Sequence, residues 1–314
     1  MLRFLTKRVA HALLVLWAAF TLSFTVLFVL PGDPVALMLG TEQMASLTPA
    51  ELAELRHTMG TDQPFLVQYG DQLWRALHLD LGQAYSNGVG VTQILGEAAP
   101  KTIALAAASL ALGVAAGVAI AVLANLTRSG LVRGFLLTLP PLGVSLPTFW
   151  VGLMLLQIFS FQLGWFPAFG ERTAATLVLP TVTLAVPISA ATAQVLNKSL
   201  SATIREPYAD VLRAKGVGPL RILFAHGLRN ASLPALTTVG VMVAGLLGGS
   251  VLTETVFSRN GLGQVAAVAV GQKDIPVVQG VVLLAALIFV VVSLAVDILY
   301  TVLDPRIKLH QEAS

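Results

Sequence analysis

Six long stretches of this chain contain no aspartate, glutamate, lysine or arginine, and they limit its possible folds more than any other feature. A helix of about 20 apolar residues crosses a hydrocarbon core of about 30 Å. Only 11% of the 314 residues are charged, whereas a soluble domain carries about a quarter. We therefore expect an all-α integral membrane protein with six transmembrane helices packed as one bundle. The stretches cover about residues 9–30, 102–125, 135–159, 175–196, 233–253 and 275–296.

Residues 1–30 are expected to hold an N-terminal tail and the first transmembrane helix. The rival interpretation is a cleaved signal peptide, whose apolar region spans about 7–15 residues and ends at a small-x-small site. Here the uncharged run continues from Val9 to Leu30, and no such site lies nearby. We therefore interpret the run as an uncleaved helix.

The next segment, residues 31–101, is expected to form an ordered lobe outside the membrane. Eight acidic residues stand against three basic ones, and turn-forming glycine and proline recur. Thr48 can cap a helix that has proline at its first position and Glu51 in its first turn. We expect this helix to end near Gly60 and a second helix to cover residues 64–78.

Glycine and proline recur inside the apolar stretches. Gly113 and Gly117 form a G-x-x-x-G pattern, and so do Gly245 and Gly249. This spacing lets another helix approach closely in lipid, but chance in an Ala/Gly-rich helix explains the first pair equally well. Prolines in spans survive when neighbouring helices satisfy the freed carbonyls; here they indicate either kinks that open a central space or simple packing bends. These prolines are Pro140, Pro141, Pro147, Pro180 and Pro187.

The distribution of lysine and arginine predicts the orientation, because cytoplasmic loops carry an excess of both. With the N-terminus inside, thirteen of the nineteen bases fall in inner segments. Both termini, including the tail 304–314, and residues 198–232 are then cytoplasmic, and the 31–101 lobe is extracytoplasmic. The inner bases are Arg3, Lys7, Arg8, Arg128, Arg133, Lys198, Arg205, Arg213, Lys215, Arg221, Arg229, Arg306 and Lys308.

The sequence lacks the common motifs of catalysis. It has no cysteine, no G-x-x-x-x-G-K-[ST] phosphate loop, no H-E-x-x-H and no G-x-S-x-G. The five histidines are scattered and do not pair at metal-ligand spacing. We expect no enzymatic activity, no metal and no cofactor in this chain. The histidines are His11, His57, His78, His226 and His310.

The apolar stretches also lack the ionisable groups that mark ion or proton relays in membranes. Glu254 and Asp297 lie at the ends of stretches, where a carboxylate can reach the interface. A proton-coupled transporter needs such groups near the middle of the membrane. We therefore expect an external energy source; the alternatives are a stand-alone secondary transporter or channel, and a scaffold without a transport role.

Residues 198–232 form a polar, strongly basic segment between two apolar stretches. Pro207 suits the first position of a short helix and Gly216 suits its end. A second helix opens at Gly218-Pro219. The apolar residues of each helix fall on one face, which predicts a docking surface; if the bases only fix topology, two proline-started helices stay unexplained. These apolar residues are Tyr208, Val211 and Leu212, then Leu220, Leu223 and Phe224.

The sequence Asp-Val-Leu-Arg-Ala-Lys-Gly at 210–216, with His-x-Leu-Arg-Asn-Ala-x-Leu-Pro at 226–234, resembles the cytoplasmic coupling loop of ABC importer permeases. It is most similar to the dipeptide, oligopeptide and nickel branch of these binding-protein-dependent permeases. Where many permeases have Glu-Ala-Ala, this chain has Asp-Val-Leu at 210–212. Further motifs in the same order cover nearly the whole chain: L-P-G-D-P (30–34), D-x-P-x-x-x-Q-Y (62–69), D-L-G (80–82), P-x-T-x-x-L-A (100–106), E-T-V-F (254–257), G-L-G (261–263), D-x-P-x-x-x-G (274–280) and L-D-P-R (303–306).

The resemblance implies six transmembrane helices of the type I ABC importer permease kind, with an extracytoplasmic lobe between helices 1 and 2. Residues 102–303 would be the type 1 core, with five helices and the coupling loop. It also implies a heterodimer with a second homologous permease, two ATPase subunits that bind ATP and Mg, and an extracytoplasmic substrate-binding protein. The setting would be a bacterial inner membrane, with no nucleic acid partner.

In this reading the chain forms half of the translocation pathway for peptides or similar small solutes. Dipeptides, oligopeptides, nickel chelates and opine-like solutes all fit the sequence. The coupling helix would cover about residues 206–216. The residues assigned to ATPase coupling are Glu206, Tyr208, Asp210, Leu212, Arg213, Ala214, Lys215, Gly216, Arg221, His226, Arg229 and Asn230. The polar residues that could line the pathway, or equally bond their own helix carbonyls, are Ser145, Thr148, Gln157, Thr183, Thr192, Gln194 and Glu254.

Overall fold

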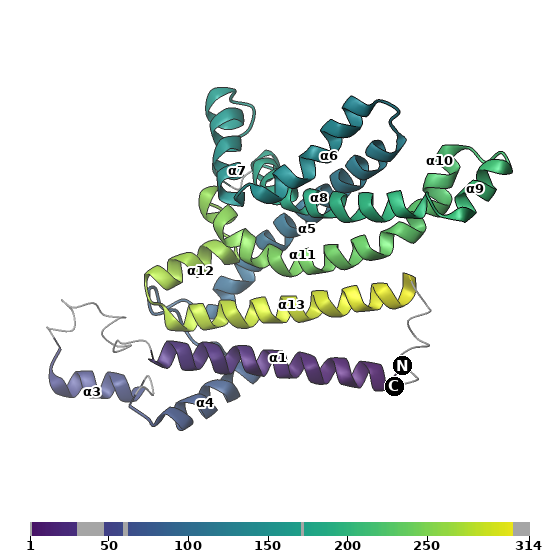
Figure 1. The fold of residues 1–314 in the computed structure, drawn as a ribbon. Helices are drawn as coiled ribbons and strands as arrows, with labels where there is room; N and C mark the ends of the chain where they lie inside the picture. Colours follow the sequence, from purple (N-terminus) through teal and green to yellow (C-terminus); the bar gives the residue numbers. More distant parts are fainter. Residues whose placement is uncertain (1, 30–46, 59–61, 171–172, 304–314) are drawn as a thin grey trace. The chain divides into compact units, whose positions relative to one another are not determined.

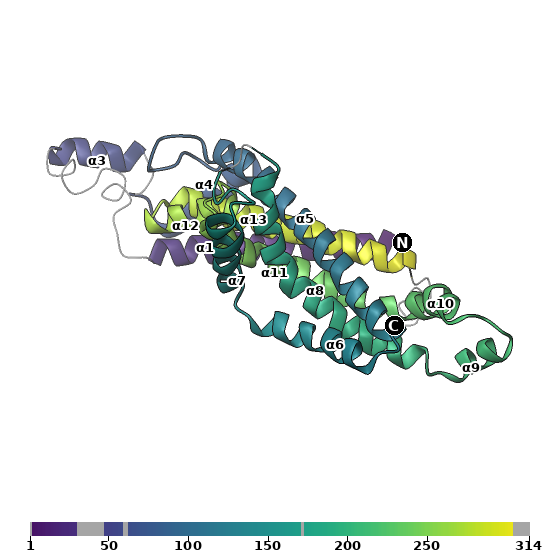
Figure 2. The same ribbon diagram turned by 90° about the horizontal axis from the view of Figure 1, so that it is seen from above.

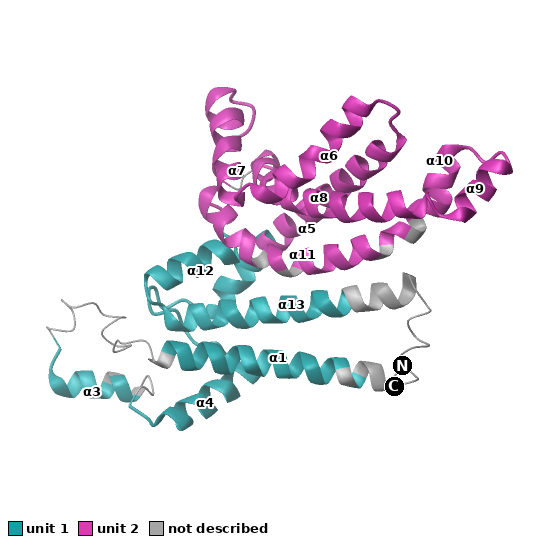
Figure 3. Cartoon of the chain, viewed as in Figure 1, with its two compact units in different colours: residues 1–101, 260–314 teal, residues 102–259 magenta. Residues whose placement is uncertain are grey.

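The computed structural model describes residues 2–29, 47–58, 62–170 and 173–303. The regular secondary structure of the described residues consists of helices and a single isolated β-bridge between Gln83 and Gly90. It divides into two compact units, one of residues 1–101 with 260–314 and one of residues 102–259 (Figure 3). The predicted turn at 30–34, the helix stop at Gly60 and the tail 304–314 lie outside the described residues.

Unit 1 contains α1 (Leu2–Val29), α3 (Pro49–Thr58), α4 (Phe65–Leu77), the start of α5 (Val91–Leu126), α12 (Leu262–Gly271) and α13 (Ile275–Leu303). The long helices α1 and α13 lie side by side and run in opposite directions (Figure 1). The core of this unit joins the beginning of α5 to α12 and α13. Its buried residues are Ala84, Val91, Leu95, Ala98, Leu262, Ala269 and Val277.

The two predicted helices of the lobe are present. Thr48 and Glu51 form a capping box at the start of α3: the Thr48 N–H donates to the Glu51 carboxylate at 2.8 Å, and the Glu51 N–H faces the Thr48 hydroxyl at 3.4 Å. Two hydrogen bonds hold the pKa of Glu51 below its usual value. The larger effect comes from the Thr48 backbone N–H and the smaller one from the Thr48 hydroxyl. However, α5 begins at Val91, well before the lobe boundary expected at Lys101, because neither Glu97 nor Pro100 interrupts the helix.

Unit 2 contains the rest of α5, then α6 (Gly130–Ser145), α7 (Thr148–Leu155), the π-helix η1 (Leu156–Gln162), α8 (Ala175–Thr203), α9 (Pro207–Ala214), α10 (Pro219–Arg221), the π-helix η2 (Ile222–Gly227) and α11 (Leu228–Val256). The most deeply buried of these helices is α8, which packs against α6, α7 and α11. The loop after α5 and the segment from α9 to η2 lie at the same end of this unit (Figures 1 and 2).

The first glycine pair is a packing motif. An added Cβ at Gly113 would lie 2.7 Å from Ile188 Cβ, and one at Gly117 would lie 2.7 Å from the Ser189 carbonyl oxygen. Both glycines therefore let α5 approach α8 to backbone distance. The second pair does not act together: Gly249 faces Leu184 of α8, while Gly245 has open space beside it.

The third apolar stretch is not one helix. It consists of α6 and the α7–η1 rod, which meet at an angle of 108°. Leu146 ends α6 with an extended backbone, the conformation that a following proline favours, and Pro147 then precedes the first turn of α7. The other predicted kink prolines, Pro140, Pro141, Pro180 and Pro187, lie inside α6 and α8 without ending either helix.

By length and composition, the described part of the chain contains four candidate membrane spans, or up to six if each bent helix pair is one span. Four helices in the described part of the chain are long and apolar enough, namely α1, α5, α8 and α13. Two bent pairs complete the six if each is taken as one span: α6 with α7–η1, and the two halves of α11. The all-α membrane fold expected from the sequence is therefore confirmed.

Candidate functional site

The helix α9 stands out because its two ends are fixed by the residues that sequence analysis singled out. Glu206 precedes it with an extended backbone, and Pro207 occupies the first turn. At the other end, Gly216 has φ +77°, a left-handed conformation that side chains disfavour. The Gly216 N–H donates to the Arg213 carbonyl at 2.9 Å, and the next N–H, from Val217, donates to the Leu212 carbonyl at 3.0 Å. This pair of bonds is a Schellman motif, and it closes the helix.

Arg213 joins α9 to the end of α8. Its Nη1 donates to the Asp210 carboxylate one turn earlier, and its Nη2 donates to the Ile204 carbonyl at 2.9 Å. Ile204 is the C-cap residue of α8, where carbonyls lack helical partners and a cation is favourable. Asp210, whose contact the sequence could not name, therefore helps to orient the arginine that ties the two helices together.

The exposed apolar face of this segment differs from the predicted one. Ala209 is fully buried, and Tyr208 and Leu212 are half-buried beside it, so this face of α9 packs inward. Val211 is 54% exposed and points away from the unit. In the following turns Leu223 is buried, whereas Leu220 and Phe224 are exposed. The outward apolar surface therefore consists of Val211, Leu220 and Phe224, because register against the bundle, not helix periodicity alone, decides which face turns outward.

The segment is firmly connected to the transmembrane helices. Leu223 lies in a buried cluster with Leu200 of α8 and Ala231 of α11, and α5 contributes Ala121 to the same cluster. An added Cβ at Gly227 would lie 3.1 Å from Leu200, so η2 lies close against α8. The η2 part of the segment is therefore packed against three helices of unit 2, and close packing transmits displacement.

The other residues assigned to coupling mostly face outward. In the described structure Glu206, Ala214, Lys215, Arg221 and His226 are exposed, and all of them except Ala214 have polar or charged side chains. Arg229 and Asn230 fall in the first turn of α11, and their side chains lie outside what the structure describes. The segment therefore presents an exposed apolar surface together with mainly basic side chains.

The predicted pathway residues fall into two groups. Ser145, Gln157 and Gln194 are exposed, Thr148 is half-buried, and Gln194 lines a cavity of about 260 Å³ between α5, α6 and α8. Thr183 and Thr192 are buried, and the Thr183 hydroxyl donates to the Leu179 carbonyl of its own helix at 2.8 Å. Both threonines are therefore packed between helices in this structure.

Glu254 corrects a sequence expectation. It is fully buried, not placed at an interface, and its Oε1 accepts a hydrogen bond from the Thr102 hydroxyl at 2.7 Å. A second network, which is partly buried, was also missed: the Asn125 side-chain amide donates to Asn197 at 2.8 Å, and the Ser201 hydroxyl donates to Asn125 at 2.9 Å. Each network joins residues far apart in the sequence. The motifs at 100–106 and 254–257 contain Thr102 and Glu254, but neither motif predicts that the two residues meet.

We expect Thr102→Val to lower the free energy of unfolding by about 1–3 kcal/mol, because a buried carboxylate loses a donor without gaining water. Thermal unfolding in detergent measures this effect. Thr183→Val is the matched control, since that hydroxyl donates to a carbonyl of its own helix, and we expect a smaller loss. Equal unfolding temperatures for the two variants would show that the Thr102–Glu254 contact does not stabilise the fold.

Among the described residues, no group of three or more histidine, aspartate or glutamate side chains could hold a metal ion. The arrangement is instead that of a membrane bundle with an exposed helical segment at one end. A buried polar pair joins α5 to α11, and a partly buried pair joins α5 to α8. These features are those of a helical membrane-spanning protein with an exposed helical segment at one end.

Comparison with known proteins agrees with this class. The family model of the binding-protein-dependent transport system inner membrane component matches residues 113–309, and the N-terminal model of the same transport systems matches residues 1–106. The chain therefore belongs to the binding-protein-dependent transport system inner membrane component family. It is a permease subunit of an ABC importer, and as such it is not the catalytic subunit.

Two relatives cover the chain almost completely. The di/tripeptide transport system permease protein DppB of Pseudomonas aeruginosa is 33% identical over 339 residues, which is 99% of this chain and 100% of that protein. The glutathione transport system permease protein GsiC of Pectobacterium atrosepticum is 35% identical over 308 residues, 98% of this chain and 99% of that protein. Among solved structures, the inward-facing MetNI methionine ABC transporter has a TM-score of 0.57 at 20% identity, covering 68% of this chain and 97% of that chain. This likeness concerns the fold alone.

Proposed function

We propose that this chain is the permease that carries peptides or similar small solutes across a bacterial inner membrane, paired with a second homologous permease. ATP and Mg are bound by two separate ATPase subunits, and an extracytoplasmic binding protein delivers the solute. The observation that carries the proposal is the α9–η2 segment, which exposes Val211, Leu220 and Phe224 while it is packed into α5, α8 and α11. A surface that is both exposed and rigidly connected suits the transfer of motion from an ATPase to the spans.

The charges support an orientation with both termini in the cytoplasm. The loop after α5, whose sequence includes Arg128, lies at the same end of unit 2 as α9 and η2 (Figure 2). Excess basic charge at one end is typical of the cytoplasmic side. In this topology α3 and α4 belong to the extracytoplasmic lobe, and the type 1 core of residues 102–303 contains unit 2 together with α12 and α13.

A face of α11 suits the second permease. Val241, Gly245, Gly248 and Leu252 follow one another at intervals of three or four residues, and all four are exposed. An added Cβ at Gly245 or Gly248 would meet open space. Small residues allow close helix approach in lipid, so this face can receive a partner helix. In the paired state, Ser145, Thr148, Gln157 and Gln194 remain the candidates for the pathway.

Reconstitution in vesicles tests the function. We expect ATP-dependent uptake of dipeptides only when this chain is combined with the second permease, the ATPases and the binding protein. The relatives named for di/tripeptides and glutathione make these solutes the first to assay. Solute flux through vesicles that hold this chain alone would favour the stand-alone transporter or channel.

A further inference from the structure

The short helix α4 has an inner face that is fully engaged with α1. The hydroxyls of Tyr69 and Thr21 are hydrogen-bonded at 2.8 Å. The ring of Phe65 lies 5.3 Å from that of Phe24, and the ring of Tyr69 lies 5.5 Å from that of Phe20. Positions 65 and 69 are one turn apart, so one side of α4 is fastened along α1.

A second face of α4 is apolar and exposed. Leu66 is 77% exposed, Trp74 is 66% exposed and Leu77 is 70% exposed, and Gly70 lies between them with open space at its Cβ position. These four positions follow at intervals of four, four and three residues, so they form one stripe along the helix. No element in the described part of the chain covers this stripe.

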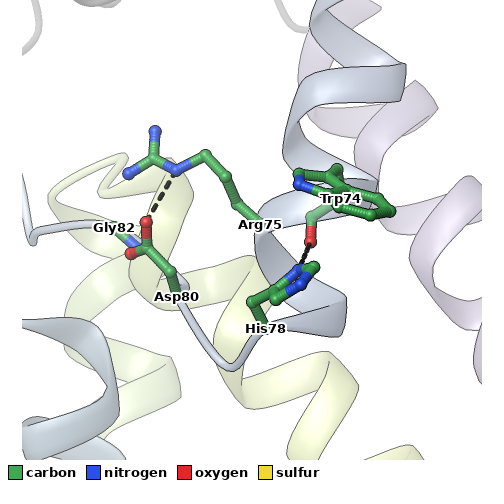
Figure 4. A network of polar contacts seen from close by, with 5 residues as sticks. All are labelled: Trp74, Arg75, His78, Asp80 and Gly82. Atoms are coloured by element: carbon green, nitrogen blue, oxygen red, sulfur yellow. Dashed lines mark hydrogen bonds and ion pairs between the residues drawn. The ribbon is translucent and has the colours of Figure 1, made fainter.

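A third face of α4 is polar and continues into the turn that follows. It carries Asp71 and Arg75 in succession, and the Arg75 Nε donates to the Asp80 carboxylate at 2.8 Å (Figure 4). The Gly82 N–H donates to the other oxygen of Asp80 at 3.0 Å. Both bonds hold the pKa of Asp80 below its usual value, and the bond from Arg75 has the larger effect. This end of α4 therefore stays charged at neutral pH.

The depth of α4 identifies what meets the apolar stripe. Phe20, Thr21 and Phe24, which hold its inner face, lie within the apolar span Arg8–Leu27 of α1. A helix that packs against a span at that level lies within the thickness of the bilayer, not above its surface. An amphipathic helix with tryptophan on its apolar side is typical of the membrane interface.

We propose that α4 lies in the lipid leaflet at the C-terminal end of α1, with Leu66, Trp74 and Leu77 in the acyl chains and Asp71 and Arg75 toward the headgroups. The helix acts as a lateral anchor that fixes the lobe against the membrane surface. The inference needs only that α1 crosses the membrane, so it stands apart from the transport function.

Spin-label accessibility tests the anchor directly. The chain has no cysteine, so Leu66→Cys, Leu77→Cys and Asp71→Cys each place one nitroxide on the same helix. The full chain is reconstituted in vesicles of phosphatidylethanolamine and phosphatidylglycerol. Collision with oxygen, which concentrates in hydrocarbon, is compared with collision with a nickel chelate, which stays in water. We expect the oxygen-to-nickel ratio at positions 66 and 77 to exceed that at position 71 severalfold, because oxygen concentrates in hydrocarbon and the nickel chelate stays in water.

Two outcomes overturn the proposal. Equal nickel access at all three positions would show that the stripe faces water. Labels at 66 and 77 that are shielded from both reagents would show that protein covers the stripe. A second variant leaves α4 unaltered, so that a folding defect caused by the cysteines cannot explain the result. In it, the other three tryptophans are replaced by phenylalanine. Trp74 emission should then be quenched by bromine on the acyl chains and not by aqueous iodide, and the reverse pattern refutes the anchor.

Discussion

Replacing Gly216 by valine should reduce ATP-driven uptake about tenfold while membrane insertion stays normal. A left-handed backbone costs a residue with a side chain about 1–2 kcal/mol, and about 1.4 kcal/mol is a tenfold change in an equilibrium. Gly216 has φ +77° and supports the bonds that close α9. The strain should therefore displace the C-terminal end of α9 and leave the spans intact. Uptake by the reconstituted assembly, compared with the amount of chain in the membrane, measures the effect.

Gly218 provides the matched control for this substitution. Its backbone is extended (φ −65°, ψ 153°), and an added Cβ has open space, as it does at Gly216. Gly218→Val should therefore keep near-normal uptake, and Gly216→Asn should restore part of it, since asparagine tolerates the left-handed region. Normal uptake in Gly216→Val, or an equal loss in Gly218→Val, would show that the conformation of Gly216 is not what matters.

Replacing Gly117 by alanine should destabilise the transmembrane bundle by about 1–3 kcal/mol, the usual cost of overpacking a tight contact. The new Cβ would lie 2.7 Å from a backbone oxygen of α8 and 2.7 Å from Thr192 Cβ. Backbone atoms cannot move aside as a flexible side chain can, so α5 and α8 must separate. The unfolding temperature in detergent should fall, and the yield of folded chain should fall with it.

Gly134 is the control for this second substitution, because a Cβ on its helix α6 would meet nothing within 4 Å. Alanine at that position should leave the unfolding temperature unchanged or raise it slightly, since glycine weakens a helix. If Gly117→Ala is as stable as Gly134→Ala, then α5 and α8 do not pack at backbone distance.

Much of the fold follows from local chemistry and could be predicted. The uncharged stretches gave the spans because lipid tolerates few charges. Thr48 and Glu51 gave the start of α3, and Pro207 and Gly216 gave the limits of α9, because caps and turns depend on neighbours in the sequence. These features need no knowledge of what lies across the bundle.

The missing features are those that depend on distant contacts. Pro147 was interpreted as a kink or a packing bend within one span, whereas α6 and α7–η1 are separate helices that meet at 108°. The helix α7 packs against α8 and α11, and such contacts are not encoded locally. Helix periodicity predicted one apolar face formed by Tyr208, Val211 and Leu212. Of these three, only Val211 faces outward, and packing against the bundle decides this. Glu254 was expected near an interface because it lies at the end of an apolar stretch. Its donor, Thr102, is remote in the sequence, so the buried contact could not be predicted.

Chemical protection of α9 tests most directly whether a separate ATPase acts through this helix. A single cysteine at Val211 is unique in the chain, and its rate of reaction with a water-soluble maleimide is measured with and without the ATPase subunits. We predict that the ATPases slow this reaction about tenfold, which needs a docking free energy of only about 1.4 kcal/mol. A cysteine at exposed Leu131, outside the segment, should react at an unchanged rate, and one at buried Ala209 should react slowly throughout. Equal rates at position 211 with and without the ATPases would contradict docking at α9.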